Sequence, residues 1–132
     1  MSAPLEQELT IERFESGHVD PGRFDHEAHV YIAWLYVTTF DTAAAILRFD
    51  NALRRLTAEL GVPEKYHATI TWLFLLLVAE KSREDERWER FKARNEDLFG
   101  DSKTILRRYY SEGLLSSQRA KSRFLLPDRL AI

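Results

Sequence analysis

The stretch from Ala68 to Val78 constrains the fold most, because it is apolar on every face of a helix. A helix without a polar face does not lie at the surface of a globular protein, so other elements must surround it. The apolar run covers about a dozen residues, whereas a bilayer span needs roughly 20. The run therefore predicts a buried central helix from Pro63 to about Lys81. Four of its side chains are expected in the core: Leu73, Phe74, Leu76 and Leu77.

Most of the remaining chain also places apolar residues at helical spacing, and no segment alternates as a strand would. Asp25, Asp41 and Asp101 are typical N-cap residues, and Gly61 is typical of a helix end. Helices are expected over residues 5–15, 25–40, 42–60, 63–81 and 83–100, in a short segment from 101, and in one further turn after Ser116 or Ser117.

These elements predict an all-α fold, a compact bundle of about five helices around the apolar one. The chain has 132 residues, of which 45% are hydrophobic, and this is enough to bury one core. We therefore expect a single helical domain over residues 1–132. Residues 1–22 would form an N-terminal helix and loop, and residues 123–132 a loose C-terminal tail.

Charge and residue content exclude several classes of function. The formal net charge is -2, and basic residues alternate with acidic ones around residues 83–87, so the one-sided positive surface of a nucleic-acid-binding protein is missing. The chain has no cysteine, which leaves His, Asp and Glu as metal ligands. No secretory pattern is found at the start, so we expect a cytoplasmic protein without a membrane partner. A homo-oligomer is compatible with the sequence.

Three of the four histidines, His26, His29 and His67, lie near the starts of two predicted helices. One intervening helix and two short loops join the helix at 25–40 to the helix at 63–81, so these two are expected to run in the same direction. The side chains of His26 and His67 would then approach within roughly 8 Å at one end of the bundle. A helix N-terminus disfavours protonation of a nearby imidazole, so neutral rings are expected.

Neutral imidazoles that lie together can act as acid/base groups or as metal ligands. In the first case, the three histidines would be the catalytic residues of a pocket for a small polar molecule, lined also by Trp34, Tyr66 and Thr71. In the second, they would hold a divalent metal such as Zn or Fe with one open position, although His-x-x-His alone is a weak motif. Arg119 and Arg123 could bind an anionic ligand if the tail folds over the histidines.

The same residues also allow a non-catalytic interpretation. A histidine near a helix start often forms a hydrogen bond to a backbone group and serves the fold alone. The chain would then be a helical interaction module, and an exposed apolar patch without a cavity near His67 would favour this alternative. Whether the protein is an enzyme is left open by the residues.

Two motifs give the chain a resemblance to known proteins. Phe24, His26, His29 and Trp34 form the pattern Phe-x-His-x-x-His-x-x-x-x-Trp, and Tyr66, His67, Thr69 and Thr71 form Tyr-His-x-Thr-x-Thr. The chain resembles small bacterial proteins of unknown function that carry both motifs, over roughly residues 14–80 and again at 127–129. The resemblance implies a bacterial protein and no particular activity.

Overall fold

The structure is a computed structural model that describes residues 8–129, and its regular elements in this range are all helices. In chain order they are α2 (Ile11–Glu15), η1 (Pro21–Arg23), α3 (His26–Thr39), α4 (Thr42–Glu59), η2 (Pro63–Lys65), α5 (Ala68–Lys81), α6 (Trp88–Arg94), η3 (Glu96–Leu98), α7 (Ser102–Tyr109), α8 (Glu112–Leu115) and α9 (Gln118–Ser122). The predicted all-α fold is confirmed. Residues 5–7 of the helix predicted over 5–15 lie outside the described residues. Within the described part, Leu9 and Thr10 are not helical, because Thr10 is the N-cap of α2, and α2 forms only the second half of the predicted helix.

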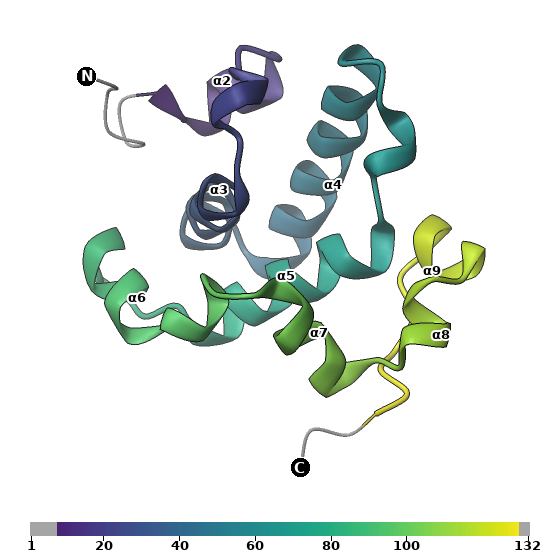
Figure 1. The fold of residues 1–132 in the computed structure, drawn as a ribbon. Helices are drawn as coiled ribbons and strands as arrows, with labels where there is room; N and C mark the ends of the chain where they lie inside the picture. Colours follow the sequence, from purple (N-terminus) through teal and green to yellow (C-terminus); the bar gives the residue numbers. More distant parts are fainter. Residues whose placement is uncertain (1–7, 130–132) are drawn as a thin grey trace.

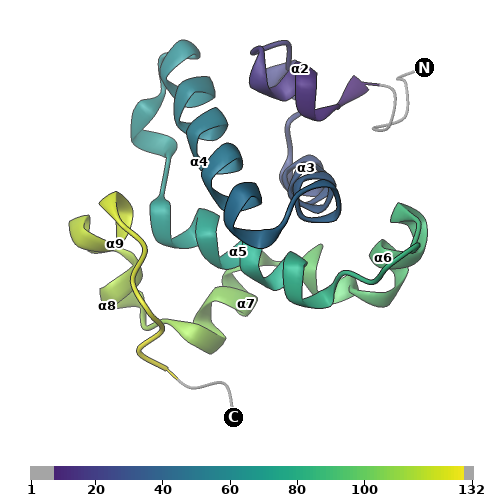
Figure 2. The same ribbon diagram turned by 180° about the vertical axis from the view of Figure 1, so that it is seen from behind.

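Helix α5 is central, as its apolar sequence predicts. It packs against α3, α4 and α9, with α8 and α9 near one of its ends and α6 near the other (Figures 1 and 2). Leu73 and Leu77 are buried as expected, together with Leu75 and Val78. Phe74 and Leu76 are only partly buried, because the neighbouring helices do not cover α5 on every side. Within residues 8–129, no helix combines the length and apolarity that a bilayer span requires.

The arrangement of α3 and α5 differs from the predicted one. Figures 1 and 2 both show α3 end-on, whereas α4 and α5 lie across the view, so α3 crosses α5 instead of running beside it in the same direction. The reason lies in the buried residues of α3, which are spread around the helix. Phe14 of α2 and Phe49 of α4 contact Tyr36, while Trp88 of α6 contacts Tyr31. Because α3 contacts neighbours on several faces, it does not lie beside α5 in the same direction, as the two short loops alone had predicted.

Local capping follows the sequence closely. The Asp25 carboxylate accepts a hydrogen bond from the Ala28 amide at the start of α3, and Asp41 does the same for α4. Asp101 caps α7 in the same way. Gly61 follows α4 with a φ of 75°, a left-handed conformation that glycine adopts without strain. These helix limits therefore agree with the predicted ones.

Two predicted helices are shorter in the structure than in the sequence prediction. The helix expected over 63–81 begins at Ala68, because Pro63 starts a separate 3-10 turn and the backbone at Tyr66 and His67 is extended. The helix expected over 83–100 is reduced to α6 and η3. Asp85 adopts a positive φ of 59° in a turn before α6, which prevents an earlier helix start.

The segment predicted as a loose tail is attached to the rest of the protein as far as residue 129. The Leu125 amide donates to the Thr69 hydroxyl, and the Leu125 carbonyl accepts from the Tyr110 hydroxyl. The Asp128 carboxylate accepts from Ser111, at the start of α8. The prediction missed this attachment because its partners are distant in sequence and are not part of a helical pattern.

Candidate functional site

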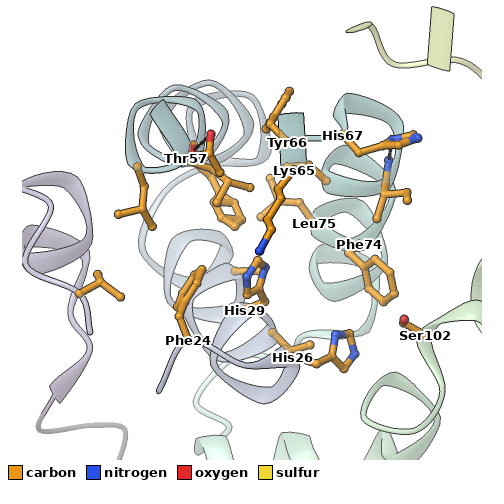
Figure 3. A pocket seen from close by; sticks show the side chains of 18 of the residues that line it. Phe24, His26, His29, Thr57, Lys65, Tyr66, His67, Phe74, Leu75 and Ser102 are labelled. Carbon is orange, nitrogen blue, oxygen red and sulfur yellow. Dashed lines mark hydrogen bonds between the residues drawn. The ribbon is translucent and has the colours of Figure 1, made fainter. Parts of the chain in front are cut away.

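A cavity of about 610 Å³ lies between α3, α4 and α5, beside η2 and the loop that precedes α3 (Figure 3). Pockets for small molecules commonly have volumes of about 300–1,000 Å³. The wall is mainly apolar and includes Val30, Leu53, Leu56, Phe74, Leu75 and Val78. His26, His29 and His67 all line this cavity. The two histidine motifs of the sequence therefore contribute to one site, but their rings have different surroundings.

His67 is held by two hydrogen bonds within the protein. It is the N-cap of α5, and its Nδ1 accepts from the Ile70 amide at 3.2 Å. Its Nε2 lies 2.8 Å from the carbonyl oxygen of Leu115 in α8. Because Nδ1 must accept, the ring proton is assigned to Nε2, which donates it to Leu115. Both ring nitrogens are therefore occupied, and the ring connects α5 to α8.

His26 also contacts a distant backbone group. Its Nε2 lies 2.6 Å from the carbonyl oxygen of Leu98, so the ring connects the start of α3 to η3. The ring packs in a T-shaped arrangement against Phe74, with 5.5 Å between the ring centroids. In Figure 3, Phe74 lies between His26 and His67. These two histidines therefore have contacts of the kind that stabilise a fold.

His29 differs from the other two, because neither of its ring nitrogens has a hydrogen-bond partner among residues 8–129. Its ring packs against Phe24, with 4.1 Å between the centroids. Burial of the ring lowers the pKa of His29 to about 4, and repulsion by His26 adds to this shift, while the Asp25 carboxylate opposes it. The ring is therefore neutral at pH 7, with one nitrogen free to donate and the other free to accept.

Two of the other predicted ligand-binding residues, Thr71 and Tyr66, line the cavity. Thr71 has no side-chain hydrogen bond among the described residues, so its hydroxyl is available to a ligand. The Tyr66 hydroxyl instead donates to the Asp50 carboxylate, which also accepts from the Trp72 indole at 3.1 Å. Tyr66 therefore contributes to the cavity mainly through its ring.

The remaining three predicted residues do not line the cavity. Trp34 packs against Tyr31 and Trp88, and its buried indole nitrogen has no hydrogen-bond partner within residues 8–129. Arg119 and Arg123 belong to α9 and its C-cap, and both are exposed. Helix α9 packs on α5 through Ala120, whose carbonyl accepts a hydrogen bond from Thr69. In this arrangement the two arginines lie at the surface and not in the cavity wall.

Lys65 is a cavity residue that the sequence analysis did not identify. It ends the 3-10 turn η2, and Figure 3 shows its ammonium group pointing toward the ring of His29. It forms no ion pair with any carboxylate of residues 8–129. Its place directly before the Tyr-His motif was the available signal, but a pattern in the sequence does not show where an exposed lysine points.

The predicted three-histidine metal site is not assembled in the part of the chain that the structure describes. No three His, Asp or Glu side chains there are arranged to hold a metal ion. Comparison of the chain with protein-family models, with curated proteins and with solved structures gives no match. The cavity and its lining are therefore the features of the molecule that bear on function.

Proposed function

We propose that this protein binds a small molecule with a largely apolar body in the cavity between α3, α4 and α5. The observation that carries the proposal is the cavity of about 610 Å³, whose mainly apolar wall contains the ring of His29, which has no hydrogen-bond partner in the described part of the chain. Apolar surface that leaves water contributes roughly 25 cal/mol per Å² to binding, and a few polar groups then fix the ligand's orientation. This chemistry favours an amphipathic ligand over the small polar molecule expected from the sequence.

The pKa of His29 supports binding more than acid/base catalysis. An efficient general base has a pKa near the working pH, whereas the pKa of this ring is about 4. A base this weak removes protons poorly at pH 7, but its neutral ring can still form a hydrogen bond to a ligand. His26 and His67 are less suited to proton transfer because backbone carbonyls already occupy a ring nitrogen in each. We therefore assign His29 the role of orienting a ligand.

A neutral dye that fluoresces in apolar surroundings, Nile red, tests this proposal. The wild-type protein should bind the dye with saturable fluorescence, and decanol should displace it. Thr71→Trp places a large ring in the cavity, so this variant should lose dye binding while keeping its helical circular dichroism.

Thr104→Trp is the matched control, because Thr104 is exposed on α7 and does not line the cavity. This variant should bind the dye as the wild type does. Equal dye binding by the two tryptophan variants, or no saturable binding by the wild type, would show that the cavity is not a ligand site.

A further inference from the structure

We propose that the ligand is an acidic amphiphile whose anionic head group binds between the Lys65 ammonium group and the His29 ring. This inference rests on the proposed function and specifies its ligand class. It follows from three observations: which polar groups of the cavity are free, what charge they carry and where they point.

Half of the polar side chains that line the cavity are already engaged in hydrogen bonds within the protein. The Thr57 hydroxyl donates to backbone carbonyls of its own helix, and the Tyr66 hydroxyl donates to Asp50. His26 and His67 contact the carbonyls described above. Four lining side chains have no hydrogen-bond partner among residues 8–129: His29, Lys65, Thr71 and Ser102. Any polar recognition of a ligand must come mainly from these four.

The charge of the lining is positive. Among the described residues that line the cavity, Lys65 alone is formally charged at pH 7, and no Asp or Glu is present. Asp25 influences His29, but it is exposed at the N-cap of α3 and does not line the cavity. A cationic head group would therefore be repelled. An anionic one would form a charge-assisted hydrogen bond with the lysine, which is stronger than a neutral one.

The positions of the two groups fit a head group that is held between them, beside the apolar wall of the cavity. Lys65 is exposed, whereas its ammonium group points inward toward His29 (Figure 3). The ring of His29 can donate its N–H to a carboxylate while its other nitrogen stays unprotonated. The cavity wall also includes Leu53 and Leu75, whose side chains suit an alkyl chain. The lysine stem adds further apolar surface at the entrance.

Decanoate and decanol form a matched pair of ligands, because they share one alkyl chain and differ in the charge of the head group. Each is measured by displacement of Nile red at pH 7.5, in the wild type and in Lys65→Met, which removes the charge and keeps an unbranched side chain. We expect Lys65→Met to weaken decanoate binding by about five- to tenfold, a value reduced for the solvent exposure of the lysine. Decanol binding should stay unchanged. Lys65→Arg should retain most of the decanoate affinity.

Lys103→Met is the control for a general loss of positive charge, because Lys103 is exposed on α7 and does not line the cavity. It should leave the affinities for both ligands as in the wild type. Equal weakening of decanoate by Lys65→Met and Lys103→Met, or equal weakening of decanoate and decanol by Lys65→Met, would overturn the head-group proposal and leave the cavity proposal intact. Failure of both ligands to displace the dye from the wild type would overturn both.

Discussion

His29 and His67 both line the cavity, but they differ in their hydrogen bonds within the protein. The ring of His67 accepts from the Ile70 amide and donates to the Leu115 carbonyl, so its two nitrogens are used within the protein. The ring of His29, by contrast, has no hydrogen-bond partner among the described residues. Because the two rings differ in this way, the functional and the structural alternatives can be tested separately at each histidine.

We predict that His67→Ala lowers the free energy of unfolding by about 1–3 kcal/mol, because it leaves the Leu115 carbonyl and the Ile70 amide without their partner. Urea unfolding measures the change. His67→Asn should recover part of the loss, since asparagine is a good N-cap but does not reach Leu115 in the same way. His18→Ala, at an exposed site, should stay within about 0.5 kcal/mol of the wild type. A loss of the same small size for His67→Ala would contradict its structural role.

We also predict that His29 makes stability depend on pH. Its pKa is about 4 in the folded protein and 6.5 in the unfolded chain, so the unfolded state binds more protons between these two pH values. Above pH 6.5 the ring is neutral in both states, and the free energy of unfolding is not reduced by its protonation. As the pH falls toward 4, the free energy of unfolding decreases by up to about 3 kcal/mol, because the unfolded chain takes up the proton first.

The measurement is urea unfolding of the wild type and of His29→Gln, whose side chain does not titrate, across this pH range. The free energy of unfolding of the wild type should decrease relative to that of His29→Gln as the pH falls. Direct NMR titration of the ring gives an independent check, and a midpoint near the ordinary histidine pKa would refute the prediction.

At the scale of the elements, one buried hydroxyl, that of Thr69, forms several of the hydrogen bonds that attach the C-terminal segment to α5. Thr69 is fully buried in the first turn of α5, and its Oγ1 lies 2.7 Å from the Ala120 carbonyl and 2.8 Å from the Arg123 carbonyl. The same oxygen accepts from the Leu125 amide at 3.2 Å. One side chain therefore attaches both α9 and the following chain to the central helix.

We predict that Thr69→Val costs about 1–3 kcal/mol of stability, because the methyl group leaves these buried backbone groups without a partner. Hydrogen exchange at the Leu125 amide should become faster in this variant and remain slow in Thr69→Ser, which retains the hydroxyl. Thr104→Val, on the exposed face of α7, is the matched control and should change stability by less than about 0.5 kcal/mol. Unchanged exchange at Leu125 would show that other contacts hold the segment.

At the scale of the whole molecule, the cavity results from the way in which three helices pack. Helix α3 crosses α5 and also contacts α2, α4 and α6 through large aromatic residues such as Tyr31 and Tyr36. Helices that cross in this way diverge on either side of the contact, and the space between them is lined by Phe74 and Leu75 of α5. The partial exposure of Phe74 is the local consequence of that space.

The sequence by itself determined the all-α fold, the central position of α5 and most helix limits. These features depend on local physics: an apolar helix must be buried, and Asp25 and Asp41 cap the helices that follow them directly in the chain. The sequence also indicated His29 and Thr71 as residues of one pocket, since both lie near the starts of helices that short loops were expected to bring together, and both line the cavity.

Only the tertiary structure decided how the histidines differ, where Lys65 points and how the C-terminal segment is attached. Each of these depends on a partner that is far away in the chain. His26 meets Leu98, His67 meets Leu115, and Thr69 meets the chain around residue 123. A helical pattern fixes which face a residue occupies on its own helix, but the crossing of helices fixes what that face meets.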